Sequence, residues 1–125
     1  FLLPYWIRHH ASMFDMAILI DYNSTDQSLE IIRREAPTSW KVVSSRNKDF
    51  DSQLVDEEVV EYEKMHPNAW KIVLNTPEFL VHSNLRQMLA DIESNDSVKT
   101  FRVRSLIMGL PEMSFDIYRV PLLLA

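Results

Sequence analysis

The sequence contains no cysteine and a single glycine, Gly109, among its 125 residues. Without cysteine there is no disulfide framework, no thiolate chemistry and no zinc site of the cysteine type. An average chain of this length would hold roughly nine glycines. Phosphate-binding loops of the Walker or dinucleotide type need several glycines, because the backbone must approach the phosphate closely. Any nucleotide bound here must therefore be held by side chains and a metal.

Excess basic charge and long apolar runs are also missing. The net charge is −5, whereas binding of nucleic acid through bulk charge needs a basic surface, so no nucleic-acid partner is expected. No apolar run approaches the length of a membrane span, so we expect no transmembrane segment. No secretory signal is visible, and the compartment stays open.

The hydrophobic content of 46% is typical of a folded domain rather than of a disordered tail. The chain starts at Phe1 and stops inside the apolar run 120–125. We therefore expect residues 1–125 to form a single α/β domain that is cut, at both ends, from a larger molecule.

Short apolar runs alternate with segments of helical periodicity along the chain. Helices are predicted from Pro4 to Phe14, after a cap at Ser24 or Asp26 and ending before Pro37, over 49–65, and after a cap at Asn84. Buried strands are predicted over 16–20, 40–44 and 69–74, and a half-exposed strand over 98–107. This order predicts βαβ units in a three-layer α/β/α arrangement around a mostly parallel sheet.

Two of the predicted strands end in polar clusters, at 21–26 and 75–79. In an open α/β sheet, ligands bind outside the carboxyl ends of the strands. Both clusters are therefore expected to line one crevice.

The first cluster contains a carboxylate, Asp21, that can accept hydrogen bonds from a base or a ribose. Ser24 and Asp26 can cap the next helix, whose N-terminus favours anions. The simpler interpretation is a strand–turn–helix junction, where Asn, Asp and Ser gather for local reasons, and the residue types alone favour it. Residues 23–25 also match the acceptor pattern for N-glycosylation, to which we give little weight because a ligand-facing turn is a poor place for a glycan.

The second cluster has Glu78 as its acidic residue, with the amide of Asn75 beside it. Divalent cations such as Mg²⁺ bind carboxylate and phosphate oxygens together. Pro77 offers no side-chain oxygen and is typical of a residue that ends a strand. Arg46, after the strand at 40–44, is a candidate for contact with a diphosphate, although surface arginines are common.

The histidines and glutamates have ordinary structural interpretations. His10 lies on an apolar helix face and is expected to be a core histidine with its hydrogen bonds satisfied, whereas His9 is expected to be exposed. The acidic run in the longest helix is expected to be a solvated face. It consists of Glu57, Glu58, Glu61 and Glu63.

Four segments in order resemble one known family. They are residues 3–10 (LPYWIRHH), residues 20–26 (IDYNSTD), Gln53 at the start of the longest helix, and residues 70–81 (WKIVLNTPEFLV). They are similar to segments of the family-2-like glycosyltransferases of GT-A fold, close to a galactosyltransferase group. The likeness covers residues 2–108.

The resemblance implies transfer of a sugar from a nucleotide donor, a uridine diphosphate sugar, to a carbohydrate or glycoconjugate acceptor, with Mn²⁺ or Mg²⁺ as cofactor. The implied donor-binding residues are Asp21, Asn23, Ser24, Asp26 and Arg46. Asn75 and Pro77 would occupy the two acidic positions of the metal-binding motif, and Glu78 would take over part of the metal role. The acceptor half and the catalytic base are expected beyond Ala125, so no base is named.

Two other interpretations stay open. The departures at Asn75 and Pro77 are also compatible with a non-catalytic relative that serves as a binding or scaffold module. A weaker interpretation is a flavodoxin-like signalling domain of response-regulator type, with Asp21 as phosphoacceptor and Lys99 near the last strand.

Overall fold

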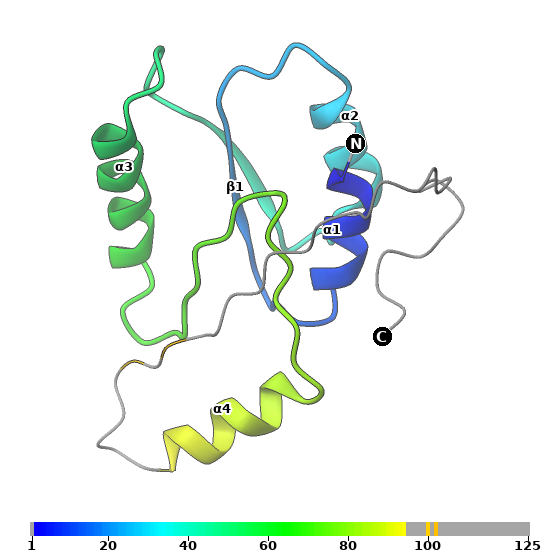
Figure 1. The fold of residues 1–125 in the computed structure, drawn as a ribbon, viewed down its shortest axis with the longest axis vertical. Helices are drawn as coiled ribbons and strands as arrows, with labels where there is room; N and C mark the ends of the chain where they lie inside the picture. Colours follow the sequence, from blue (N-terminus) through cyan, green and yellow to red (C-terminus); the bar gives the residue numbers. More distant parts are fainter. Residues whose placement is uncertain (1, 95–99, 101, 103–125) are drawn as a thin grey trace, which may run out of the picture.

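The computed structural model describes residues 2–94, 100 and 102, and every structural statement below concerns these residues. They contain four helices and two strands, in an order that alternates as expected up to residue 64 (Figure 1). The elements are α1 (Leu3–His10), β1 (Ile18–Asp21), α2 (Ser28–Glu35), β2 (Lys41–Ser44), α3 (Ser52–Lys64) and α4 (Leu85–Glu93).

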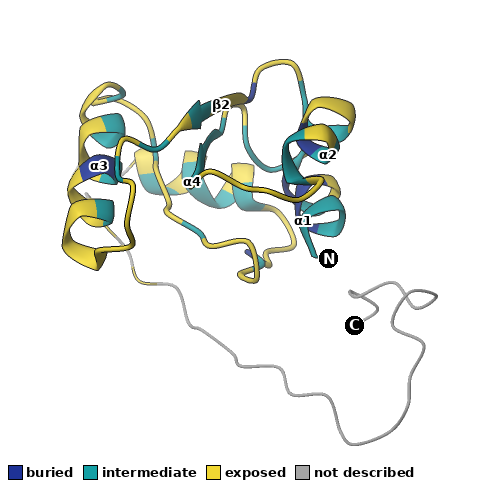
Figure 2. Cartoon of the chain, turned by 90° about the horizontal axis from the view of Figure 1, so that it is seen from above, coloured by how far each residue is buried: buried dark blue, intermediate teal, exposed yellow. Residues whose placement is uncertain are grey.

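The two strands form a parallel sheet connected by α2, which confirms an α/β fold. The register runs from Ile18 opposite Lys41 to Asp21 opposite Ser44. Figures 1 and 2 both place α1 and α2 on one side of the sheet and α3 on the other. The larger GT-A sheet stays a prediction, because the part of the chain described here pairs only these two strands.

The hydrophobic core lies where α1 and α2 cover the sheet. Its buried members are Trp6, Ile7, Ile32 and Trp40, and the Trp6 and Trp40 rings meet edge to face with 5.9 Å between their centroids. The spacing of Leu3, Trp6, Ile7, His10 and Phe14 predicts one apolar stripe on this helix, and the core contacts confirm it. Partly buried side chains pack around this core: Leu3, Phe14, Ala17, Leu19, Ile31, Ala36, Leu74 and Phe79.

Several helix ends follow from local sequence signals. Glu35 is the last residue of α2, and the extended Ala36 leads into Pro37, which excludes the helical conformation before it. Asn84 caps α4 by accepting the backbone N–H of Gln87. None of the helices in the described part of the chain is long and apolar enough to cross a membrane.

The strand predicted over 69–74 is wrong in the structure. No strand is assigned there, and the side chain of Val73 is 55% exposed. A strand needs a backbone hydrogen-bond ladder with a neighbour. Within the described part of the chain, no such backbone hydrogen bond involves residues 71–74. Figure 1 shows the segment rising from the end of α3 to the turn at 75–78 and then descending to α4. Most of the strand predicted over 98–107 lies outside the described residues.

The sequence pattern predicts Phe50, Leu54, Val55, Val59 and Tyr62 on or near one face of the helix over 49–65, and the structure differs in part. Phe50 is 85% exposed and precedes the helix, because Asp51 is the N-cap and accepts the backbone N–H groups of Gln53 and Leu54. The residues that turn inward at helical spacing are Val55, Glu58, Val59 and Tyr62. Glu58, which was predicted to lie on the solvated face, therefore faces inward.

Candidate functional site

The turn that follows β1 is closed by its own side chains. The Asp21 carboxylate accepts the backbone N–H of Ser24, with N···O distances of 3.2 and 3.4 Å to its two oxygens. Asn23 has φ 60°, the left-handed region that asparagine adopts more readily than most residues. The turn thus presents the exposed Asn23 and Ser24 beside a half-buried carboxylate at the carboxyl end of the sheet.

Asp26 contributes to the start of α2. Its carboxylate accepts the backbone N–H of Ser28 at 2.9 Å. Hydrogen bonds from the side chain and backbone of Ser28 lower the pKa of Asp26, so the group is ionised at neutral pH. The N-cap of α2 is Gln27, which makes no side-chain capping hydrogen bond, so the cap predicted at Ser24 or Asp26 is wrong, although Asp26 binds the N–H of the first helical residue.

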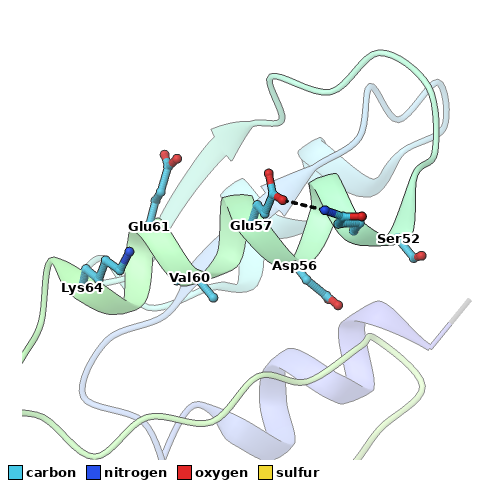
Figure 3. Close-up of a pocket in the computed structure, with 7 residues that line it drawn as sticks. Ser52, Asp56, Glu57, Val60, Glu61 and Lys64 are labelled. Carbon is cyan, nitrogen blue, oxygen red and sulfur yellow. Dashed lines mark hydrogen bonds between the residues drawn. The ribbon is translucent and has the colours of Figure 1, made fainter.

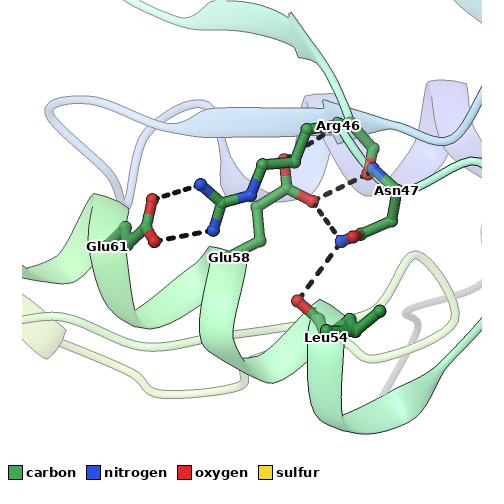
Figure 4. Close-up of polar contacts among 6 residues, drawn as sticks. Arg46, Asn47, Leu54, Glu58 and Glu61 are labelled. Carbon is green, nitrogen blue, oxygen red and sulfur yellow. Dashed lines mark hydrogen bonds and ion pairs between the residues drawn. The ribbon is translucent and has the colours of Figure 1, made fainter.

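Arg46 lies just after β2, but its guanidinium is already engaged. Two of its nitrogens donate to the two carboxylate oxygens of Glu61 at 2.6 and 2.7 Å (Figure 4). These hydrogen bonds raise the pKa of Arg46 and lower that of Glu61. A diphosphate at this place must therefore compete with Glu61 for the guanidinium.

Glu58 is the functional candidate that sequence analysis missed. It is 2% exposed, not a solvated residue as predicted. Its carboxylate accepts three hydrogen bonds, from the Ser45 hydroxyl at 2.7 Å, the Arg46 backbone N–H at 3.2 Å and the Asn47 side-chain amide at 3.0 Å (Figure 4). Its spacing of three from Val55 and four from Tyr62 was the available signal.

The Glu58 carboxylate also influences the first residue after β1. Burial, then the negative charge of Glu58, raise the pKa of Tyr22, while a hydrogen bond with Ser45 acts in the opposite direction. Tyr22 follows β1 and Ser45 follows β2, so the exits of both strands meet near Glu58. This edge of the sheet brings Asp21, Tyr22 and Ser45 into one neighbourhood.

The structure brings the two predicted metal-site residues together in a second closed turn. The Glu78 carboxylate accepts the backbone N–H of Asn75 at 2.6 Å and its side-chain amide at 3.2 Å. The Glu78 N–H donates in turn to the Asn75 carbonyl at 2.9 Å. Pro77 is exposed within this turn.

This donor set does not fit a divalent cation by itself. Glu78 already uses one carboxylate oxygen to accept two N–H groups, and Asn75 directs its amide nitrogen, not its oxygen, at Glu78. Within residues 2–94, 100 and 102, no group of three His, Cys, Asp or Glu side chains is arranged to hold a metal ion. Among these residues no hydrogen bond joins this turn to the one at 21–24.

His9 and His10 contact the backbone of Leu80, just after the second turn. His10 is fully buried, as predicted, with both ring nitrogens hydrogen-bonded. Burial lowers its pKa to about 4. His9 is half-buried rather than exposed, because its Nε2 lies 2.7 Å from the Leu80 carbonyl oxygen.

An open hollow of about 500 Å³ runs along α3 (Figure 3). Its charged lining consists of Asp56, Glu57, Glu61 and Lys64. Because three carboxylates face one ammonium group, the hollow disfavours phosphate, and we do not assign the nucleotide to it.

The chain was compared with models of known protein families, with curated proteins and with solved structures, and none of the three comparisons gave a match. The response-regulator interpretation also needs Lys99, which lies outside the described residues.

Proposed function

We propose that this chain carries the donor-binding part of a GT-A glycosyltransferase that transfers sugar from a uridine diphosphate sugar to a carbohydrate or glycoconjugate. The observation that carries the proposal is the turn after β1. β1, the first strand of the parallel β1–α2–β2 unit, ends there with a carboxylate, Asp21, which accepts the Ser24 N–H. Nucleotides bind at this edge in open α/β sheets. The ordered sequence segments supply the choice of family.

In this proposal Asp21 accepts a hydrogen bond from the ribose or the base. Only one N–H of the protein, at 3.2 and 3.4 Å, contacts the carboxylate among the described residues, so accepting capacity remains. Asn23, Ser24 and Asp26 surround the nucleoside, and Arg46 leaves Glu61 to meet the diphosphate. The exchange keeps the guanidinium paired, because one anion replaces another.

The chemistry is a displacement at the anomeric carbon of the donor sugar. The bond from that carbon to the diphosphate oxygen breaks, uridine diphosphate leaves with the electron pair, and the acceptor hydroxyl oxygen forms the new bond. The acceptor proton goes to a base outside the described residues. Arg46 stabilises the charge that develops on the leaving diphosphate.

The test is a calorimetric titration of uridine diphosphate into the full-length protein, with and without Mn²⁺. Asp21→Asn should weaken binding about tenfold, since it removes a charge-assisted acceptor. Asp91→Asn is the matched control, because Asp91 is an exposed residue of α4, and its affinity should equal that of the unmodified protein. Absence of binding by the unmodified protein under both conditions overturns the proposal.

A second candidate function is a non-catalytic binding module of the same family. Two observations favour it. The Glu78 carboxylate is hydrogen-bonded to Asn75, and the Arg46 guanidinium is paired with Glu61, so neither group is free for a ligand. Pro77→Asp should then create metal-dependent nucleotide binding that the unmodified protein lacks. Turnover of a sugar donor by the unmodified protein with a metal would exclude this candidate.

A further inference from the structure

The segment that follows β2 is fixed to α3 by one buried carboxylate. Glu58 accepts hydrogen bonds from the Ser45 hydroxyl, the Arg46 backbone N–H and the Asn47 side-chain amide. The Asn47 amide also donates to the Leu54 carbonyl at 3.2 Å, one turn earlier in α3. The backbone position of Arg46 is therefore set by α3, and any movement of this residue is expected in its side chain.

The guanidinium of Arg46 contacts a second carboxylate of the same helix. Glu61 follows Glu58 by three residues, so both side chains project to the same side of α3 (Figure 4). Arg46 Nη1 donates to Glu61 Oε2 at 2.6 Å, and Nη2 donates to Oε1 at 2.7 Å. A guanidinium forms the same two parallel hydrogen bonds with phosphate as with carboxylate. The Glu61 carboxylate thus occupies the place where this guanidinium can hold an oxyanion.

Arg46 lies at the edge of the sheet where ligands bind in open α/β folds. The backbone N–H of Ser45 donates to the carbonyl of Asp21 at 2.8 Å, so the residue before Arg46 is joined to the last residue of β1. Ligands of such sheets bind outside the carboxyl ends of the strands. The guanidinium is therefore a cation at the edge that an anionic ligand would occupy.

The pair of Arg46 with Glu61 is exposed enough to be exchanged. The two side chains are 54% and 53% exposed, and ion pairs at such positions contribute little to stability. A diphosphate carries more negative charge than one carboxylate and forms the same bidentate contact. Glu58, in contrast, is buried and keeps its three donors. Exchange of the anion therefore requires rotation of the Arg46 side chain and leaves the backbone in place.

We propose that Glu61 is a competing carboxylate that closes an oxyanion-binding position at Arg46, and that a diphosphate binds there by displacing it. Glu61 thereby lowers the affinity for the ligand, whereas Glu58 holds the backbone of Arg46. The inference rests on the proposed function for the choice of a nucleoside diphosphate as ligand. The oxyanion position itself follows from the contacts of Arg46.

Three substitutions at exposed positions separate this role from the effect of net charge. Glu61→Gln removes the competing carboxylate. Glu57→Gln is the matched control, because it removes the same charge from the same helix at a carboxylate that accepts a hydrogen bond from Gln53 and none from Arg46. Arg46→Gln removes the guanidinium. Because all three side chains are exposed, each variant is expected to fold.

The experiment titrates inorganic pyrophosphate and uridine diphosphate into the full-length protein, with and without Mn²⁺, by calorimetry. Relative to Glu57→Gln, Glu61→Gln should strengthen the affinity about threefold, and a gain with either ligand supports the inference. Arg46→Gln should weaken the affinity about tenfold.

Nuclear magnetic resonance of the Arg46 side-chain N–H groups provides a second readout. A bidentate partner slows rotation of the guanidinium. Rotation should therefore be slow in the unmodified protein and fast in Glu61→Gln, and pyrophosphate should slow it again in that variant. Equal rotation in the two proteins overturns the role of Glu61.

The inference and the proposed function fail in different ways. If uridine diphosphate binds with equal affinity to Glu61→Gln and Glu57→Gln, the competing role of Glu61 is overturned and the proposed function remains. If pyrophosphate binds more tightly to Glu61→Gln but no protein binds uridine diphosphate, the oxyanion position remains and the proposed function is overturned. Absence of binding of both ligands to all four proteins overturns both.

Discussion

Two regions of this molecule are stabilised in different ways. Residues 3–44, the α1–β2 region, bury apolar side chains between two helices and the sheet. Residues 45–94, the α3–α4 region, bury one carboxylate and one leucine, Glu58 and Leu80. Figure 2 shows buried residues at α1 and α2, whereas α3 is largely exposed apart from one buried band.

The candidate site is stabilised mainly by hydrogen bonds on its α3–α4 side. Large exposed apolar side chains concentrate in the α3–α4 region: Phe50, Leu54, Val60, Met65, Ile72, Val73 and Val81. Apolar burial therefore contributes less to the stability of this region, and hydrogen bonds fix the chain near the candidate site. Glu58 fixes the exit of β2, and the side chains of Trp6, His9 and His10 fix the segment after the Asn75–Glu78 turn through its backbone. Both polar arrangements lie beside the predicted binding turns.

The largest effect is expected from Ile7→Ala in the α1–β2 region. Ile7 is 0% exposed, and loss of a fully buried aliphatic side chain leaves a cavity that costs about 2–4 kcal/mol of stability. Urea unfolding followed by circular dichroism measures the change. Val60→Ala on α3, at an exposed position, should cost less than about 1 kcal/mol. Equal losses for the two variants would show that the regions do not differ in apolar burial.

The next effect is expected from Glu58→Leu in the α3–α4 region. The Ser45 hydroxyl, the Arg46 N–H and the Asn47 amide lose their shared acceptor. Unsatisfied buried donors cost about 1–3 kcal/mol. Urea unfolding gives the total, and amide exchange at Arg46 gives the local part. Glu57→Leu, at the neighbouring exposed position, is the matched control. An unchanged exchange rate at Arg46 in Glu58→Leu would contradict the central role of Glu58.

His10 links the two regions, and its titration gives a pH-dependent effect. Burial lowers its pKa from 6.5 to about 4, so the unfolded chain binds this proton more readily. Its contribution is complete above about pH 6.5 and is lost as the pH falls toward 4, on the order of 3 kcal/mol in total. His10→Gln should remove this part of the pH dependence, while carboxylates with lowered pKa, such as Glu35 and Glu61, titrate in both proteins. Parallel stability curves between pH 7 and 4.5 would contradict it.

The parts of the fold that sequence could predict depend on neighbours close in the chain. The stripe of Trp6, Ile7 and His10, the cap at Asn84 and the end of α2 before Pro37 each need only three or four adjacent residues. The strand at 69–74 was predicted from the same kind of local pattern and was wrong. Its formation requires a hydrogen-bonding partner strand, which a run of apolar residues does not specify.

The contacts of the candidate site also fall into local ones, which sequence could predict, and long-range ones, which it could not. Asp21 with Ser24, and Asn75 with Glu78, are three residues apart, so their turns follow from local geometry. The pair of Arg46 with Glu61 spans 15 residues, and the hydrogen bonds of α1 with Glu78 and Leu80 span 70 to 72 residues. Neither was predicted. These contacts depend on how helices pack, which the spacing of single residues does not encode. The donor-binding roles of these residues stay predictions.

The smallest effect is expected where α4 meets the α1–β2 region. The Arg86 guanidinium donates to Asp15 at 2.7 Å, but the two side chains are 61% and 85% exposed, and α4 has no buried residue. An ion pair this exposed contributes less than about 0.5 kcal/mol and weakens with salt. Arg86→Gln should therefore leave the urea midpoint nearly unchanged at 0.15 M salt, with Arg33→Gln, an exposed arginine of α2, as control. A loss above about 1 kcal/mol for Arg86→Gln alone would mean that a polar contact couples α4 to the core. In that case polar contacts would contribute as much stability to the α3–α4 region as apolar burial does to the α1–β2 region. The two regions would then differ only in the kind of interaction that stabilises them.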